Sequence, residues 1–253
     1  MVSLVVITFN EEANILRCIQ SAAGLVDEVL VVDSHSTDQT VRLAESLGAR
    51  VLLHAFEGYR EQKIWAIQQA KFDRVLVLDA DEALSSGMQQ QVAHLLLDWT
   101  HDGYYFNRLS RLGGRWIRYG AWYPDQKMRL FDRRYYQMRG ENPHDRIEPK
   151  PGARTRRIAA DILHHTNDSF HSRIDNINRF SRIAAEALFA KGVKASLWRL
   201  LLKPLIRFLS EYVWQRGFLD GLHGYFIAKT SAQYVFYRES KLWELSRGTP
   251  EIP

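Results

Sequence analysis

Two carboxylates directly follow an apolar run in residues 75–82, which read VLVLDADE. In an extended strand, side chains two positions apart point to the same side. We therefore expect Asp79 and Asp81 to face one point in space at the carboxyl end of a strand. Two hard oxygen ligands with no thiol nearby suit Mg²⁺ or Mn²⁺ better than zinc, and such an ion can grip a diphosphate. The alternative for so short a motif is a solvated acidic turn after a buried strand.

Short apolar runs alternate with helical patterns through the first part of the chain. The runs suit a sheet that is buried on both faces, and they predict strands over residues 3–8, 28–33, 50–54 and 74–79. Asp38 can cap a helix that runs to Gly48, and another helix is expected over residues 60–71. This order predicts a parallel, doubly wound α/β sheet, in which ligands bind outside the carboxyl ends of the strands.

From about Gly103 the pattern loosens. Strands are expected over residues 104–108, 127–131 and 158–163, with loops marked by glycines. Beyond His171 the pattern is helical, and we expect helices over residues 173–191, 197–214 and 218–245. These patterns predict a domain over residues 1–168, with halves at 1–100 and 101–168, followed by a C-terminal helical region over 169–253.

One of these helices is apolar over most of its girth. Arg199, Lys203, Arg207 and Glu211 recur every four residues and form a single polar stripe. The apolar remainder must be buried somewhere, and three partners are open: the first domain, a membrane interface with basic residues toward the lipid headgroups, or a second copy of the chain. Pro204 is expected to kink this helix or divide it in two.

The bulk composition is that of a folded protein, with 253 residues, 46% of them hydrophobic, and a net charge of +5. The single cysteine, Cys18, excludes an internal disulfide and is expected in the core. Residues 108–157 contain fourteen Lys or Arg and five Asp or Glu, so this segment carries +9 and the remainder −4. An excess of positive charge indicates an anionic partner. We expect neither a signal peptide nor a membrane-spanning helix, and hence a cytoplasmic protein.

Seven motifs together resemble a known family. TFNEE at 8–12, VVDSHSTDQT at 31–40 and LDADE at 78–82 resemble the strand-end motifs of family 2 glycosyltransferases with the GT-A fold. WYPDQKMRLFDRR at 122–134, NPHD at 142–145, ILHH at 162–165 and YVWQRGFLDGLHG at 212–224 are similar to the lipopolysaccharide core β-1,4-glucosyltransferase branch. The resemblance covers nearly the whole chain. It implies an inverting, metal-dependent transfer from a nucleotide sugar, usually UDP-linked, with residues 1–100 binding the donor and 101–168 the acceptor.

The resemblance also implies roles for the strand-end residues. Asp33 is expected to accept hydrogen bonds from the uracil or ribose, although it can instead cap the following helical region. Glu11 can likewise serve as a first-turn helix residue. Arg60 and Lys63 are expected to meet the diphosphate, although the family's asparagine is missing after Gln62-Lys63. The full set expected at the donor is Thr8, Asn10, Glu11, Asp33, Ser34, Arg60, Lys63, Asp79, Ala80 and Asp81.

Histidines and two further aspartates complete the expected site. By resemblance His164, or alternatively His165, joins Asp79 and Asp81 around the metal. A core histidine is the ordinary alternative. Asp145 is the preferred general base and Asp125 the alternative, since inversion needs one carboxylate to take the proton of the acceptor hydroxyl. The residues expected at the acceptor are Trp122, Gln126, Arg129 and His144.

These expectations define a function. We expect glucose to move from a UDP-sugar to a heptose of a lipid-linked core oligosaccharide, at the inner face of the bacterial cytoplasmic membrane. The protein would then be peripheral, in contact with anionic lipid. Polyprenyl phosphate or another cell-surface glycan is an alternative acceptor. A basic nucleic-acid-binding protein is a remote alternative, since no helix-turn-helix, RNP or zinc spacing is present.

Overall fold

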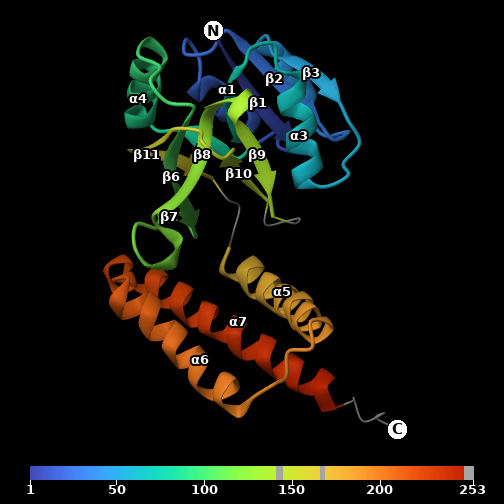
Figure 1. The fold of residues 1–253 in the computed structure, drawn as a ribbon, viewed down its shortest axis with the longest axis vertical. Helices are drawn as coiled ribbons and strands as arrows, with labels where there is room; N and C mark the ends of the chain where they lie inside the picture. Colours follow the sequence, from blue (N-terminus) through green and yellow to red (C-terminus); the bar gives the residue numbers. More distant parts are fainter. Residues whose placement is uncertain (141–144, 166–168, 248–253) are drawn as a thin grey trace. The chain divides into compact units, whose positions relative to one another are not determined.

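The computed structural model describes residues 1–140, 145–165 and 169–247 (Figure 1). Its contacts divide the chain into two compact units, residues 1–109 with 125–165 and residues 110–124 with 166–253. The segment 110–124 therefore groups with the helices, which the expected boundary at residue 168 did not anticipate. Each unit is described separately.

The first unit begins with the predicted parallel sheet. Strands β1 (Val2–Thr8), β2 (Glu28–Asp33), β3 (Arg50–Leu53) and β4 (Arg74–Asp79) lie in the order β3-β2-β1-β4. All three pairs of adjacent strands are parallel, and their register places Thr8 beside Asp33 and Ile7 beside Asp79. The strand ends therefore meet at one edge. The connecting helices are α1 (Ile15–Ser21), α2 (Thr40–Ser46) and α3 (Tyr59–Gln69).

Two apolar cores cover the two faces of this sheet. On β1, Leu4 and Val6 point into one core, while Val5 and Ile7 point into the other, as the two-residue period of a strand requires. The first core contains residues of α1, α2 and α4 (Ser86–Leu97), including Cys18 as predicted, and the second contains residues of α3. The doubly wound arrangement predicted from the sequence is thus confirmed.

Antiparallel strands extend the sheet. After β5 (Glu82–Leu84) and α4 (Ser86–Leu97) come β6 (Gly103–Leu112), β8 (Asp125–Asp132) and β11 (Thr155–His164), and the sheet continues β4-β8-β6-β11-β5. Strands β9 (Tyr136–Arg139) and β10 (Arg146–Pro149) form a separate antiparallel pair. The three strands expected here are present, and each is longer than predicted.

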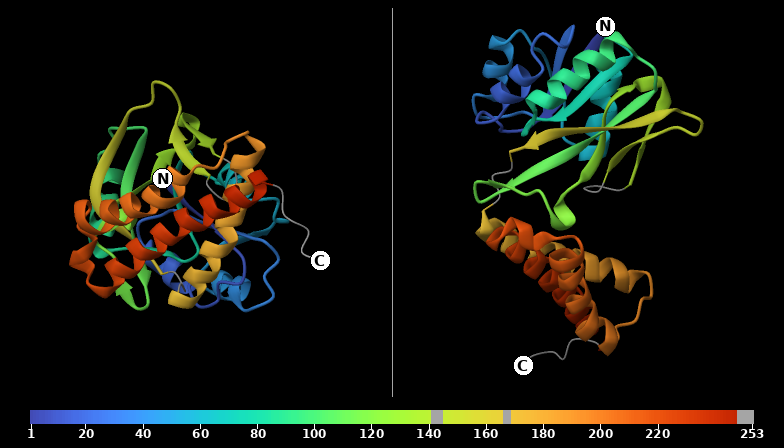
Figure 2. Two further views of the ribbon diagram at one scale, coloured as in Figure 1. Left: turned by 90° about the horizontal axis from the view of Figure 1, so that it is seen from below. Right: turned by 90° about the vertical axis from the view of Figure 1, so that its left-hand side faces the viewer.

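The second unit consists of helices and one short loop region. Figures 1 and 2 show α5 (Phe170–Ala190) and α6 (Leu197–Leu209) lying along α7 (Leu222–Arg247), with the short turns η3 (Ser210–Trp214) and η4 (Gly217–Asp220) between the last two. Residues 110–124 add β7 (Arg115–Trp116) and η1 (Gly120–Trp122). In the part of the chain that the structure describes, no helix is both long and apolar enough to cross a bilayer.

Of the two outcomes expected at Pro204, a kink or a division, the structure excludes the division. The helix is not divided there but runs on to Leu209, and its geometry changes to a π-helical turn only at Ser210–Trp214. A proline removes one backbone hydrogen bond.

Candidate active site

A cavity of about 1110 Å³ lies at the carboxyl ends of β1, β2 and β4 in the first unit. This is the edge at which ligands of open α/β sheets bind. Strands β8 and β11 reach the same place from the antiparallel half of the sheet. The predicted residues that line the cavity are Thr8, Glu11, Ser34, Lys63, Asp79, Ala80, Asp81, Asp125, Gln126, Arg129, Asp145 and His164.

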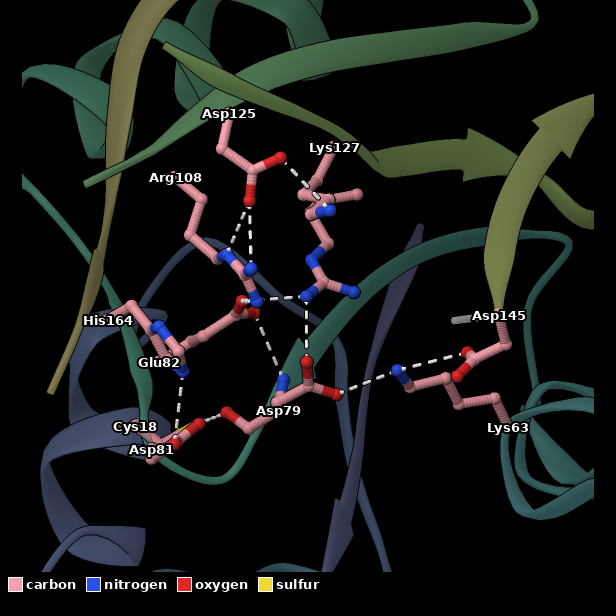
Figure 3. A network of polar contacts seen from close by, with 11 residues as sticks. Cys18, Lys63, Asp79, Asp81, Glu82, Arg108, Asp125, Lys127, Asp145 and His164 are labelled. Atoms are coloured by element: carbon pink, nitrogen blue, oxygen red, sulfur yellow. Dashed lines mark hydrogen bonds and ion pairs between the residues drawn. The ribbon is translucent and has the colours of Figure 1, made fainter. Parts of the chain in front are cut away.

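Asp81 and His164 meet in this cavity although they lie far apart in the sequence. Asp81 is in the turn between β4 and β5, and His164 ends β11, where it pairs with Glu82 of β5. Asp81 Oδ2 lies 3.1 Å from His164 Nε2 (Figure 3). Burial lowers the pKa of His164, but the hydrogen bond and negative charge of Asp81 outweigh it and raise the pKa overall. The alternative, His165, donates its backbone N–H to the Asp81 carbonyl oxygen at 2.8 Å, and it is His164 that lines the cavity.

The structure does not bring Asp79 into this pair. Its carboxylate oxygens lie 3.2 Å from Lys63 Nζ and 2.8 Å from Arg129 Nη2. Burial raises the pKa of Asp79, but Lys63 and Arg129 hold it far below its usual range. The expected same-side alternation fails because β4 ends at Asp79 and the chain turns at Ala80–Asp81. Among the described residues, no group of three His, Cys, Asp or Glu side chains is arranged to hold a metal ion.

Glu82 and Arg108 belong to the site, although the sequence analysis assigned them no role. Glu82 is 1% exposed, and its Oε1 lies 2.6 Å from Arg129 Nη2. Its Oε2 accepts a hydrogen bond from the Asp79 backbone at 3.2 Å. Glu82 and Asp79 together raise the pKa of Arg129 despite its burial, so the guanidinium stays charged. The observed register of β6 and β8 places Arg108 directly opposite Asp125, and no local signal in the sequence gives that register.

The two candidate bases differ in how tightly cations hold them. Asp125 accepts from Arg108 Nε at 3.0 Å and lies 2.8 Å from Nη2 of that residue and 3.0 Å from Lys127 Nζ. Burial raises the pKa of Asp125, but these two cations lower it overall. Asp145 makes an ion pair with Lys63, at 3.4 Å (Figure 3). Among the described residues, Asp145 therefore has fewer cationic partners than Asp125.

The donor residues expected after β1 and β2 line the cavity only in part. Both oxygens of Asp33 accept hydrogen bonds from Ser36, from its backbone N–H at 2.7 Å and from its hydroxyl at 2.5 Å, so Asp33 caps the turn after β2. Asn10 has a left-handed backbone and accepts from the backbone of Thr37 at 2.8 Å. Neither Asp33 nor Asn10 is among the described residues that line the cavity.

Neighbouring residues do line this part of the cavity. The Ser34 hydroxyl accepts from Gln62 Nε2 at 3.0 Å, and Gln62 also bonds His54 at 2.8 Å. Burial raises the pKa of Glu11, which accepts from Asn14 at 2.7 Å. The polar groups that line the cavity near the ends of β1 and β2 thus include Thr8, Glu11, Ser34 and Gln62.

Two further predicted residues do not line the cavity, and a third is not described. Arg60 pairs with Glu61 at 3.1 Å and is not among the cavity-lining residues that the structure describes. Trp122 belongs to the second unit, where the Arg173 guanidinium lies 5.0 Å from its ring centre. His144 lies outside the described residues.

Comparison with known proteins bears on this site. The family model described as Glycosyl transferase family 2 matches residues 3–160. An uncharacterized glycosyltransferase of Rickettsia typhi is 31% identical over 97% of this chain and 87% of its own length. The lipopolysaccharide core biosynthesis glycosyltransferase LpsC of Rhizobium meliloti is 27% identical over 96% of this chain and 92% of its own.

Solved structures give a weaker likeness. Glucosyl-3-phosphoglycerate synthase from Mycobacterium tuberculosis, crystallised with Mn²⁺ and UDP-glucose, is 27% identical over 44% of each chain, with a TM-score of 0.37. Because this match is so partial, it assigns neither a donor nor a metal to this chain. The family model covers more than half of the chain, over the mostly parallel, helix-flanked sheet expected of a GT-A fold. The chain therefore belongs to glycosyl transferase family 2.

Proposed function

We propose that this glycosyltransferase moves glucose from UDP-glucose to a heptose of a lipopolysaccharide core oligosaccharide, with inversion at the anomeric carbon. The observation that carries the proposal is the cavity in which Asp81, His164, Lys63 and Asp145 converge at the strand ends. The resemblance to LpsC over nearly the full length of both chains supports a core oligosaccharide as the acceptor. A lipid-linked acceptor places the protein on the inner face of the cytoplasmic membrane.

Two of the three expected ligands, Asp81 and His164, are placed so that they could bind a divalent cation. Asp81 and His164 offer one carboxylate and one imidazole, 3.1 Å apart and facing the cavity. Mg²⁺ commonly binds through one or two carboxylates and takes its remaining ligands from substrate phosphates and water. When bound, the ion would stabilise negative charge on the departing diphosphate. Asp79 does not fit a ligand role while Lys63 and Arg129 hold it; it instead orders those two cations.

Lys63 is placed to respond to the donor. Its ammonium lies 3.2 Å from Asp79 and 3.4 Å from Asp145. A diphosphate entering the cavity carries more negative charge than either carboxylate and competes for this ammonium. Asp145 would then lose its only ion pair among the described residues and become free to accept a proton.

Asp145 is the proposed general base. It takes the proton of the acceptor hydroxyl as that oxygen forms its bond to the anomeric carbon. The bond from this carbon to the diphosphate oxygen breaks on the opposite face, and UDP leaves with the electron pair. Proton transfer of this kind contributes about 10²–10⁴-fold to the rate. Asp125 is less suited because Arg108 and Lys127 lower its pKa and thus its basicity.

Transfer to polyprenyl phosphate, or to another cell-surface glycan, is the second candidate. Cationic cavity residues such as Arg108 and Lys127 could meet a lipid phosphate as readily as an acidic sugar. Turnover with polyprenyl phosphate alone distinguishes the two. The remote alternative, nucleic-acid binding, would require an affinity for DNA or RNA that falls steeply with salt.

Thermal shift with nucleotide sugars tests the donor and the metal. We expect UDP-glucose with Mn²⁺ or Mg²⁺ to raise the unfolding temperature more than other nucleotide sugars do, because a ligand that binds only the folded state stabilises it. Asp81→Ala should abolish the metal-dependent part of the shift. Glu45→Gln, on the exposed face of α2, should preserve it. Release of UDP should then require a heptose-containing acceptor. If no nucleotide sugar shows metal-dependent binding or turnover, the proposal is wrong.

A further inference from the structure

Helix α6 packs with its polar stripe inward. Arg199 lies 3.7 Å from Glu239 of α7, and Arg207 lies 2.5 Å from Glu211 at the end of the same stripe. Glu211 and Glu239 are each 1% exposed. Buried carboxylates need cationic partners, so these pairs hold the stripe against the rest of the helical unit. The basic residues that were expected to meet lipid headgroups along this stripe are partly used inside the unit instead.

The apolar side of α6 consequently faces outward. Among the described residues of α6, no side chain is buried, and Leu201 is 64% exposed. Trp214, one turn beyond the helix, is 70% exposed. The exposed residues recur at the spacing of one helix face, and the turns after the helix continue the series. We call this surface the α6 face; its residues are Leu197, Trp198, Leu201, Leu202, Leu205, Ile206, Leu209, Val213 and Trp214.

Such a surface is unusual on a protein that meets only water. Monomeric soluble proteins rarely expose a continuous apolar patch of this kind unless it binds something. The face has a tryptophan near each end, Trp198 and Trp214. Tryptophan is enriched where a protein meets the boundary between lipid headgroups and acyl chains.

The charged residues around the α6 face indicate the sign of the charge that its partner carries. Residues 191–238 contain eight Lys or Arg and two acidic residues, Glu211 and Asp220. Both acidic side chains are buried, so this stretch presents no exposed carboxylate. Lys194 precedes Trp198 and Arg216 follows Trp214, and both cations are exposed. The apolar face is therefore flanked by positive charge at each end.

We infer that the α6 face docks on an anionic lipid bilayer, with its leucines and tryptophans in the headgroup–acyl boundary and Lys194 and Arg216 at lipid phosphates. An amphipathic helix lying in the plane of the interface gains from both apolar burial and attraction to anionic lipid. A second copy of the chain is the less favourable occupant, because it would bring the same positive charges together. The inference concerns the helical unit and does not depend on which sugar or acceptor the first unit uses.

Co-sedimentation of the full chain with lipid vesicles tests this inference. Vesicles of phosphatidylcholine mixed with phosphatidylglycerol should bind the protein, and vesicles of phosphatidylcholine alone should bind it markedly less. The double variant Leu201→Gln/Leu205→Gln should reduce binding to the anionic vesicles by roughly tenfold or more, since two leucines lose their apolar burial. Lys194→Gln/Arg216→Gln should weaken binding and reduce its sensitivity to salt.

Exposed leucine-sized residues away from the α6 face provide the control. Ile174→Gln/Ile183→Gln on α5 replaces two residues that are each 53% exposed, and it should bind vesicles as the wild type does. Circular dichroism should show every variant folded, because all the replaced side chains are exposed. Two results would overturn the inference. One is equal binding of the α6 and α5 variants. The other is a wild-type dimer that dissociates in Leu201→Gln/Leu205→Gln while vesicle binding is absent.

Discussion

At the scale of single residues, the carboxylates of the cavity differ in the number of cations with which they form ion pairs. Arg129 serves both Asp79 and Glu82, and Lys63 serves both Asp79 and Asp145. Among the described residues, Asp79 therefore makes ion pairs with two cations and Asp145 with one. We propose Asp145 as the base because the donor diphosphate can compete for Lys63 and so release this carboxylate.

Replacing the proposed base separates chemistry from donor binding. Asp145→Asn should lower kcat by about 10²–10⁴-fold, because the amide cannot take the proton of the acceptor hydroxyl. Its thermal shift with UDP-glucose and Mn²⁺ should remain close to that of the wild type. Rates of UDP release at saturating donor and acceptor provide the measurement.

The matched variant is Asp125→Asn, in the same cavity. It removes the partner of Arg108 and Lys127, and we expect a smaller loss of kcat with a larger change in KM for the acceptor. If Asp125→Asn stops transfer while Asp145→Asn retains it, the two roles must be exchanged.

At the scale of elements, the short turn between β4 and β5 decides how the acidic motif is used. Its two residues, Ala80 and Asp81, rotate the second carboxylate away from the first. Strand β5 then pairs with β11, and the register brings His164 to Asp81. A strand that continued straight through residues 79–81 would have placed both carboxylates on one side, as the two-residue period predicted.

Glu28, at the start of β2, predicts a pH-dependent stability of the parallel sheet. Burial raises its pKa, but hydrogen bonds from Ser3, the Lys71 backbone and Arg50 lower it below its ordinary value of 4.5 overall. A lowered folded-state pKa means that the stabilisation is present above pH 4.5 and is lost as the pH falls through the folded value. Glu28→Gln should therefore be less stable than the wild type at neutral pH, by about 1 kcal/mol.

Urea unfolding at several pH values measures this effect. The difference in unfolding free energy between the wild type and Glu28→Gln should shrink as the pH falls below 4.5. Glu45→Gln, on the exposed side of α2, should show little difference at any pH. A constant deficit for Glu28→Gln across the whole range would contradict the assignment.

Two glycines allow η4 to fold back on α7. A Cβ at Gly224 would lie 1.8 Å from the carbonyl oxygen of Gly217, and a backbone atom cannot move aside as a side chain can. Gly224→Ala should therefore lower the stability of the helical unit by about 2 kcal/mol or more. Gly87→Ala in α4 is the matched control, since its Cβ would lie 4.0 Å from the nearest atom. Differential scanning calorimetry should show a lower Tm for Gly224→Ala than for Gly87→Ala.

At the scale of the whole molecule, the two units divide the work that we propose. The first holds the cavity and its charged residues, and the second holds the α6 face. Residues 110–124 belong to the helical unit because Asp220 accepts hydrogen bonds from the backbones of Arg118 and Tyr119, at 2.9 and 2.8 Å. The chain thus passes from β6 into the second unit and returns at Asp125 to line the cavity.

Comparing a membrane-embedded acceptor with a free one tests whether the proposed membrane contact of the second unit assists the proposed transfer in the first. With an acceptor embedded in anionic vesicles, Leu201→Gln/Leu205→Gln should lower the rate of UDP release by roughly tenfold, because less enzyme is bound at the surface. With the same oligosaccharide free in water, the variant should match the wild type. A loss with both acceptors would assign these leucines to catalysis or folding rather than to membrane contact.

Much of the first unit could be predicted from the sequence. Continuous apolar runs and their carboxyl-terminal polar residues are local signals, and they located β1, β2, β3 and β4 and the edge that carries the cavity. The family followed from motifs in a fixed order. The same reasoning brought His164 to Asp81, and the structure places the two side chains 3.1 Å apart.

Only the tertiary structure decided which charges share partners. The ion pairs of Glu82 with Arg129 and of Lys63 with Asp145 depend on strand register or helix packing between distant segments. The outward orientation of the α6 face depends on such packing as well. A helical period shows that a helix has two faces, but not which one its neighbours cover, because that choice depends on buried partners such as Glu239. Local pattern therefore determined the elements, and long-range pairing determined the use of their charged side chains.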